Sequence, residues 1–208
     1  VGVRRQRHAG GIAGRAEWLD GHLCGAGLEV RASLGLDAGT PVVLYTGTFE
    51  AYQGLDLLYG AMTHVRAALP SARLIMVGGE PAQVEAARRR VNDLGLGDVV
   101  VFTGQRPPAD VPRFLDAASV LVSPRSSGTN TPLKIYQYLR SGRPIVATGL
   151  RTHTQVLDDS TAVLTAPTAE AFGAGLLGVL ADPAAAAAMG ARARVVAETK
   201  YSDEAFME

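Results

Sequence analysis

Residues 120–148 have the sequence VLVSPRSSGTNTPLKIYQYLRSGRPIVAT, and this stretch decides the fold. It begins with the apolar run Val120–Val122 and ends with Pro144–Ala147, each with the length and β-branched composition of a buried strand. Between them, Thr131–Ser141 has the apolar spacing of a helix. Because both strands are apolar on successive residues, they are expected to be buried on both faces, which is typical of a parallel βαβ unit.

The same alternation extends along the chain on both sides of this unit. Further strands are predicted at Val42–Thr46, Arg73–Val77, Val99–Phe102 and Ala162–Leu164. Further helices are predicted at Gly54–Leu69, Val84–Leu94, Asp110–Ala118 and Thr168–Leu180. Regular alternation of strand and helix predicts an α/β fold, a doubly wound parallel sheet over residues 41–182.

The two ends of the chain lack this alternation. Residues 1–40 contain repeated glycines, and only Arg15–Leu23 could form a short helix, so we expect an irregular, poorly packed leader segment. Residues 183–208 contain the alanine run Ala184–Ala188 and are expected to form two carboxy-terminal helices.

The composition excludes several classes of protein. Lys and Arg total 20, as do Asp and Glu, so the net charge of zero gives no basic excess for a nucleic-acid partner. The single Cys24 excludes an intramolecular disulfide framework and a cysteine zinc cluster. No apolar run reaches the roughly 18–20 residues of a transmembrane segment, and no secretory signal is visible. We therefore expect a cytoplasmic domain.

Four loops that follow predicted strands are rich in glycine and small polar residues, and the carboxyl ends of parallel strands are where such sheets bind ligands. They contain Gly47, Gly79, Gly104 and Gly128 respectively. A single glycine after a strand is more often a plain turn, but four on one edge indicate a site. His153 follows a strand on the same edge and is a weaker candidate.

The fourth loop is the most informative because it leads into a helix. Thr131 is expected to cap that helix and Pro132 to occupy its first position, which leaves free backbone N–H groups suited to a phosphate. Lys134 lies in the first turn, where a cation opposes the helix dipole unless an anion is near. A solvated surface lysine is the alternative. The loop is neither an NTPase phosphate loop nor a Gly-x-Gly-x-x-Gly fingerprint.

The residues of this loop and helix also resemble a known family. The run from Pro132 to Leu139, continued by residues 141–148, is similar to the carboxy-terminal signature of the retaining group 1 glycosyltransferases (family four) of the GT-B fold. Other stretches of the chain match in the same order, at residues 45–49, 53–56, 74–79, 101–104, 110–112 and 118–124. The resemblance covers residues 31–208 and implies a Rossmann-like domain of the GT-B fold.

The resemblance implies a function and a set of site residues. This half would bind a nucleotide-diphosphate sugar, linked to UDP or GDP, for transfer of a hexose, with no metal or other cofactor expected. Lys134 and Gln137 would act on the donor, Lys134 near the diphosphate and Gln137 at the ribose. The other implied donor-binding residues are Gly47, Thr48, Gly79, Gln105, Arg106, Ser127, Gly128, Thr129, Asn130, Thr131, Pro132 and Leu133. An amino-terminal acceptor-binding domain would be the missing partner.

Departures from the family pattern leave a second hypothesis open. Charged residues of the family are replaced by Thr48 and Gln53 in the first loop, and by Thr129 and Gln137 around the signature. Because leaving-group stabilisation in this chemistry is mostly electrostatic, fewer charges weaken catalysis. Lys134, Arg125 or Arg106 could supply the charge. The alternative is a catalytically impaired module that binds the nucleotide sugar without its own transferase activity.

Overall fold

The computed structural model describes residues 25–201. Its centre is a sheet of six strands in the order β3-β2-β1-β4-β5-β6, and all neighbouring strands are parallel. The strands are β1 (Val42–Thr46), β2 (Arg73–Val77), β3 (Val100–Gly104), β4 (Val120–Ser123), β5 (Ile145–Thr148) and β6 (Val163–Thr165). The predicted α/β parallel sheet is thereby confirmed, with strand ends within two residues of those expected.

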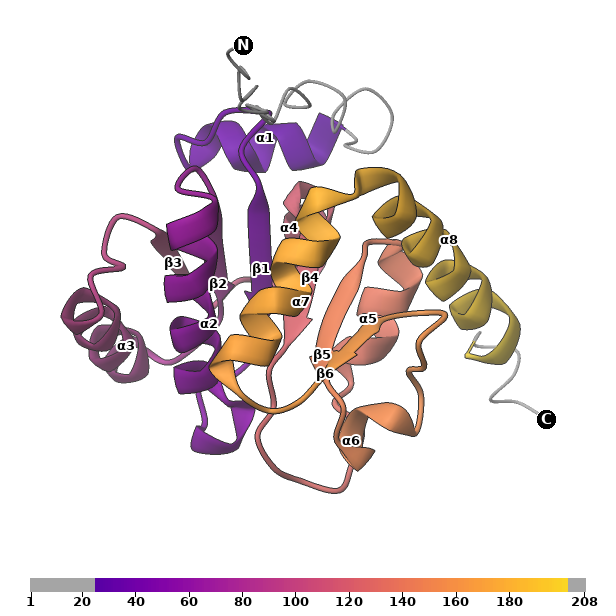
Figure 1. Cartoon of the computed structure of the whole chain (residues 1–208). Helices are drawn as coiled ribbons and strands as arrows, with labels where there is room; N and C mark the ends of the chain where they lie inside the picture. The colour runs from indigo at the N-terminus through magenta and orange to yellow at the C-terminus, as the bar shows by residue number, and fades with distance from the viewer. Residues whose placement is uncertain (1–24, 202–208) are drawn as a thin grey trace, which may run out of the picture.

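Helices cover both faces of the sheet (Figure 1). They are α1 (Gly25–Ser33), α2 (Leu55–Ala68), α3 (Pro81–Asp93), α4 (Val111–Ala117), α5 (Lys134–Ser141), α6 (Arg151–Thr154), α7 (Ala169–Ala181) and α8 (Pro183–Lys200), with 3-10 turns η1 (Ala51–Gln53) and η2 (Pro108–Asp110). Helices α2, α3 and α7 pack on one face, and α1, α4 and α5 on the other. Strand β1 shows why: Val43 and Tyr45 belong to one apolar core and Val42 and Leu44 to the other.

Helix α1 corrects the expectation of an irregular leader. Residues 25–33 are helical, and Gly27 lets α1 lie so close to α4 that a Cβ there would be 2.6 Å from the Asp116 carbonyl oxygen. Arg31 is buried and donates to the carbonyl oxygens of Ala117 at 2.9 Å and Ala38 at 2.7 Å, among others. Burial lowers its pKa to about 10, with Arg143 as a second cause. The predicted helix Arg15–Leu23 lies outside the described residues.

At the carboxy-terminal end, one helix replaces the two that were predicted. α8 is continuous from Pro183 to Lys200, capped by the Asp182 side chain, which accepts from the Ala185 amide at 3.0 Å. Its first half contacts the core on the α2 and α7 side, and Ala193 and Ala197 contact the other core. α8 therefore wraps around the β6 end of the sheet (Figure 1). Residues 202–208 lie outside the described part of the chain.

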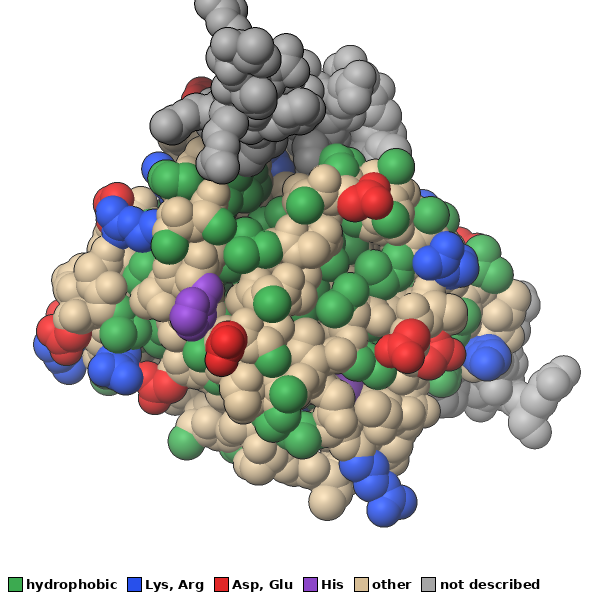
Figure 2. All heavy atoms as spheres, viewed as in Figure 1, with side chains coloured by type: hydrophobic (Ala, Val, Ile, Leu, Met, Phe, Trp, Pro, Cys, Tyr) green, Lys and Arg blue, Asp and Glu red, His purple; other side chains and the backbone are tan. Residues whose placement is uncertain are grey.

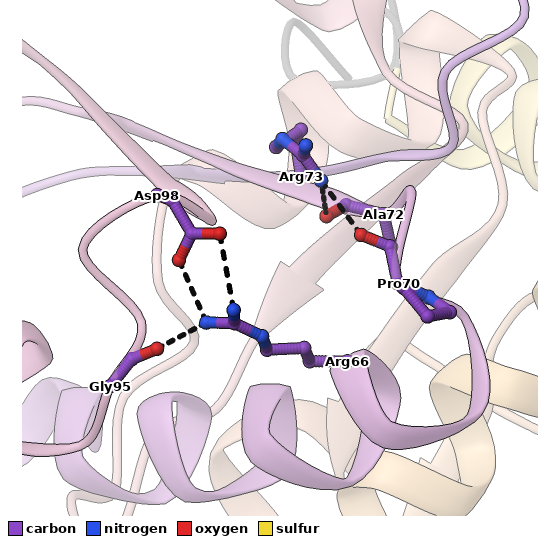
Figure 3. Close-up of polar contacts among 6 residues, drawn as sticks. All are labelled: Arg66, Pro70, Ala72, Arg73, Gly95 and Asp98. Atoms are coloured by element: carbon purple, nitrogen blue, oxygen red, sulfur yellow. Dashed lines mark hydrogen bonds and ion pairs between the residues drawn. The ribbon is translucent and has the colours of Figure 1, made fainter.

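The end of the sheet opposite the candidate site is held by arginine contacts (Figure 3). Arg66, in the last turn of α2, forms two hydrogen bonds to the Asp98 carboxylate, at 2.7 and 3.1 Å, and donates to the Gly95 carbonyl. Arg73, at the start of β2, donates to the carbonyl oxygens of Pro70 and Ala72. These contacts join α2 to the turns before β2 and β3, at the amino ends of these strands.

The described surface of the face formed by α2, α7 and α8 has scattered charges of both signs (Figure 2). Apolar side chains gather over its centre, and the charged groups lie mostly toward its margins. No single described helix is both long and apolar enough to cross a membrane, although α7 and α8 together, bent by 102°, pass that length and composition test.

Candidate functional site

The candidate site lies where the strand order reverses. Strand β1 has β2 on one side and β4 on the other, so the chain leaves these neighbouring strands in opposite directions and a crevice opens at their carboxyl ends. The loops after β1 and β4 meet there. The Ser126 amide donates to the Tyr52 carbonyl at 3.0 Å, and Gly54, at φ +72°, lies so close to the Pro124 carbonyl oxygen that a Cβ would be 2.0 Å from it.

The loops after β2 and β3 join the same edge. Gly78 packs on Gly47, where a Cβ on Gly78 would be 2.0 Å from the Gly47 carbonyl oxygen. In the next loop, Gln105 donates to the Glu80 carboxylate at 2.6 Å. The four predicted loops therefore form one continuous edge. A depression of about 410 Å³ lies beside the start of α3 and is lined in part by Gly79, Gln105 and residues of β3.

Lys134 connects α5 to the first loop. Its ammonium donates to the Thr46 carbonyl at 3.1 Å and to Gln53 Oε1 at 3.3 Å, and it lies 4.0 Å from the centre of the Tyr45 ring. A Cβ on Gly47 would be 3.1 Å from the Tyr45 hydroxyl and 3.4 Å from the Nζ atom, so Gly47 lies directly beside the ammonium. The structure thus places Lys134 with Gly47 at the centre of the crevice and does not support a merely solvated lysine.

The charge of Lys134 has no counter-ion among the described residues. Its neighbours are a carbonyl oxygen, an amide oxygen and an aromatic ring, all of them neutral. Burial, together with the smaller effect of the nearby Arg125, lowers the pKa of Lys134 to about 7. An ammonium has three N–H donors, and two are used by the protein, so one is left for a ligand. The arrangement favours a bound anion, which would restore the charged form.

Tyr138 fixes the orientation of α5 and is a site residue that the sequence reasoning missed. Its hydroxyl accepts from the Thr46 amide at 3.0 Å and donates to the Val122 carbonyl at 3.4 Å, so it joins the ends of β1 and β4. Burial raises its pKa to about 12. It follows Lys134 by four residues, on the same face of the helix, and both side chains bind Thr46. The four-residue spacing from Lys134 is the feature of the sequence that could have identified Tyr138.

Side chains of helix α6 and of the residue that follows it hold the loop after β4, by donating hydrogen bonds to the carbonyl groups of the loop. The Asn130 carbonyl accepts from the Thr152 hydroxyl at 2.8 Å, and the Thr129 carbonyl accepts from the Gln155 side chain, just after α6, at 2.8 Å. At the end of β5, the Thr148 hydroxyl donates to the Arg125 carbonyl at 2.7 Å. Because the supports bind carbonyl groups, the loop is braced from behind and its exposed residues 126–130 stay on the outer side.

His153 braces the same region from inside the protein. It is fully buried, and its Nδ1 lies 2.8 Å from the Thr148 carbonyl oxygen, an acceptor, so Nδ1 carries the proton. Nε2 then accepts from the Ser123 hydroxyl at 2.8 Å. Burial lowers the pKa of His153 to about 4, with the cations of Lys134 and Arg125 as smaller causes. His153 is therefore a neutral structural residue behind the site.

The remaining residues that the sequence predicted for the site differ in their exposure and contacts. Leu133 is 83% exposed, and Gln137 is exposed on α5 one turn after Lys134. Thr48 accepts through its carbonyl from the Tyr45 hydroxyl at 2.6 Å. The Arg106 guanidinium lies over the Phe114 ring, 5.8 Å from its centre, and is not among the contacts of Lys134 described above.

The predicted helix cap is wrong. The α5 helix starts at Lys134, after Leu133, and no side chain caps it; Thr131 and Pro132 precede it, and the Pro132 carbonyl accepts from the Ile135 amide at 2.9 Å. The physical reason is that the first turn closes on backbone carbonyls instead of on the threonine hydroxyl.

Within residues 25–201, no group of three His, Cys, Asp or Glu side chains could hold a metal ion, and the expected metal independence stays a prediction.

Two curated relatives are about one third identical to this chain over the aligned residues. It is 32% identical over 180 residues to a D-inositol 3-phosphate glycosyltransferase of Segniliparus rotundus, covering 84% of this chain and 40% of the relative. It is 33% identical over 163 residues to a GDP-mannose-dependent phosphatidylinositol monomannoside mannosyltransferase of Mycolicibacterium smegmatis, covering 74% and 42%. The chain thus spans about two fifths of the length of these relatives.

Solved structures and a family model agree with the fold. Sucrose-phosphate synthase of Thermosynechococcus elongatus matches with a TM-score of 0.73 and 29% identity, over 85% of this chain and 45% of that one. An Anabaena protein, Alr3699/HepE, solved with UDP-glucose, matches with a TM-score of 0.77 at 20% identity, over 85% and 49%. The family model described as glycosyl transferases group 1 matches residues 40–182. The chain therefore belongs to the group 1 glycosyltransferase family, and its sheet is the Rossmann-like kind found in the GT-B fold.

Proposed function

We propose that this chain is the donor-binding half of a retaining glycosyltransferase that transfers a hexose from a nucleoside-diphosphate sugar. An amino-terminal domain would supply the acceptor site and the facing wall of the cleft. The proposal extends the family assignment to this chain's own residues, and the relatives' greater length supports the second domain.

The observation that carries the proposal is the isolated cation of Lys134. In the reaction, the bond between the anomeric carbon and the diphosphate oxygen breaks, the diphosphate leaves with the electron pair, and the acceptor hydroxyl loses a proton as its oxygen bonds to the sugar. Negative charge grows on the diphosphate. The ammonium of Lys134, partly desolvated and oriented by Thr46 and Gln53, would stabilise that charge.

The remaining edge of the site offers places for the rest of the donor. The depression lined by Gly79 and Gln105 would take the base, and the Gln137 amide would hydrogen-bond the ribose. The exposed residues 127–130 would face the sugar. Both bases deserve a test, because a relative's name specifies GDP-mannose and a solved neighbour holds UDP-glucose.

Calorimetric titration with UDP and GDP tests the proposal. We expect one of them to bind, and binding near pH 7 should take up protons, because an anion raises the lowered pKa of Lys134. Titrations in buffers of different ionisation enthalpy measure that uptake. Affinity should weaken as the pH rises above 7, where the free ammonium loses its proton. Absence of binding by both nucleotides would overturn the proposal.

A matched pair of variants connects the binding to the site. Lys134→Met should lose the nucleotide affinity and the proton uptake together. Lys200→Met removes the other lysine, which lies exposed at the end of α8, and should change neither. Equal behaviour of the two variants would contradict the role of Lys134.

A second candidate is a binding module without transferase activity. The uncharged Thr48, Gln53, Thr129 and Gln137 favour it, because fewer charges would stabilise the leaving diphosphate. Such a module would bind the nucleotide yet leave a UDP- or GDP-hexose intact, even with an amino-terminal domain of a relative added. Release of the hexose or of the nucleoside diphosphate would decide for the enzyme.

A further inference from the structure

Arg125 is a second cation of the crevice that the fold leaves without a counter-ion. It lies two residues after the end of β4, and within residues 25–201 its guanidinium pairs with no carboxylate. One nitrogen, NH1, donates to the Asn130 carbonyl at 2.8 Å and to the Thr152 hydroxyl at 3.2 Å. The guanidinium lies over the Tyr52 ring, 4.9 Å from its centre.

The unusual feature of Arg125 is its Nε–H group. This atom is buried and has no hydrogen-bond partner in the described part of the chain. A buried donor without an acceptor costs stability, and native structures rarely leave one without a reason. Three of the five guanidinium N–H donors, on Nε and NH2, are without a protein acceptor, although the loop around them is well braced.

The loop is shaped around this side chain. Gly128, at φ +119°, packs so closely that a Cβ there would be 3.0 Å from NH2 and 3.1 Å from Nε. Any larger residue at 128 would therefore cover the nitrogen atoms that lack partners. Because Gly128 has no Cβ, no side chain at this position covers Nε or NH2 where the loop after β4 meets the loop after β1.

Arg125 and Lys134 lie close enough for their charges to repel, since Arg125 is one cause of the lowered pKa of Lys134. Two neighbouring cations without a carboxylate are unfavourable in the empty protein, and one monoanion compensates only one of them. A ligand with two negative charges on adjacent groups compensates both, and the planar guanidinium suits oxygen atoms of a phosphate.

We propose that Arg125 is a phosphate-binding residue that, with Lys134, forms a two-cation site for the diphosphate of the donor, reached through its unpartnered Nε and NH2 donors. This assignment rests on the proposed function and adds a residue to it. Arg125 would contact the diphosphate at the β4 side of the crevice, while Lys134 contacts it at the β1 side.

Calorimetry with UDP, UMP and uridine, and with GDP, GMP and guanosine, tests the assignment on the 208-residue chain. Removing one charge-assisted pair of contacts by Arg125→Met should weaken diphosphate binding about 10- to 100-fold, and leave the weak binding of the nucleoside unchanged. Arg125→Lys keeps the charge but not the planar donors and should recover part of the loss. Arg113→Met, which removes an exposed arginine paired with Glu29 at the far end of the sheet, is the matched control and should bind as wild type.

Arginine Nε–H resonances give a second readout that is independent of affinity. The correlation missing in Arg125→Lys identifies Arg125, and it should shift when UDP or GDP is added but not when the nucleoside is added. An equal loss of nucleoside and diphosphate affinity would make Arg125 only a shaping residue of the loop and overturn the assignment, as would an unshifted resonance. Failure of wild type to bind any nucleotide would instead refute the proposed function.

Discussion

Replacing Lys134 by methionine separates what the residue does for function from what it does to stability. Methionine has similar length and no charge, so it removes the ammonium and leaves the hydrocarbon stem. In the folded protein the pKa of Lys134 is lowered from 10.5 to about 7, first by burial and then by Arg125. The unfolded chain therefore binds this proton more tightly than the folded protein does between these two values.

The sign of the pH dependence follows from that difference. Below pH 7 the full cost of keeping a poorly solvated ammonium is present in the folded protein, and it is relieved as the pH rises from 7 toward 10.5. One pKa unit corresponds to about 1.4 kcal/mol, so the unfolding free energy of wild type should rise by about 2 kcal/mol relative to Lys134→Met between pH 7 and pH 9. Loss of the hydrogen bonds to Thr46 and Gln53 changes the unfolding free energy of the variant by the same amount at both pH values. It therefore leaves the slope with pH unchanged.

Urea unfolding followed by circular dichroism at pH 6, 7, 8 and 9 measures this slope. Lys200→Met should run parallel to wild type across the range. A difference between wild type and Lys134→Met that stays constant with pH would show that the ammonium is not held at a cost, and would remove the electrostatic reason for an anion at this place.

Three further changes test other parts of the fold. His153→Gln removes a histidine whose pKa is lowered from 6.5 to about 4, so wild type should lose about 2 kcal/mol relative to this variant between pH 7 and pH 5, measured by urea unfolding. Gly54→Ala should cost about 2–4 kcal/mol, because φ is +72° and the new Cβ would strike the Pro124 carbonyl, whereas Gly35→Ala, at φ +68° with open space, should cost only about 1–2 kcal/mol. Arg31→Met leaves several buried carbonyl groups unpaired and should lower the unfolding free energy by about 2–4 kcal/mol, with a matching fall in melting temperature.

The strands were predictable from the sequence because each is a short, uninterrupted β-branched run, a pattern that burial on both faces imposes. Helix α1 was not predictable from the sequence, because a glycine in it can either interrupt a helix or allow close packing. In isolation glycine disfavours a helix, yet Gly27 is what allows α1 to lie directly on α4. Only the neighbour that approaches it, far away in the sequence, distinguishes a glycine that packs from one that interrupts.

The candidate site was likewise predictable only in part. The position of Lys134 at the start of α5 followed from local spacing, but its contact with Gln53, which lies 81 residues earlier, depends on which strands are neighbours. The role of Arg125 depends on the same adjacency, because its guanidinium lies over Tyr52 from the loop after β1. Contacts of this kind arise at the point where the strand order reverses, and a single sequence does not state that order.

A net charge of zero is compatible with an anion site, because the site needs only two cations that no carboxylate balances and not an excess of basic residues over the whole chain. Lys134 and Arg125 lie in contact with neutral groups, and no carboxylate among the described residues balances their charge. His153 behind them is held neutral and adds no third positive charge. Several other described arginines form ion pairs, as Arg66 does with Asp98, lie over aromatic rings, or donate to a set of backbone carbonyl groups, as Arg31 does. The folded chain thus bears a local electrostatic cost that a bound diphosphate would relieve, which makes binding and stability opposite demands on the same two residues.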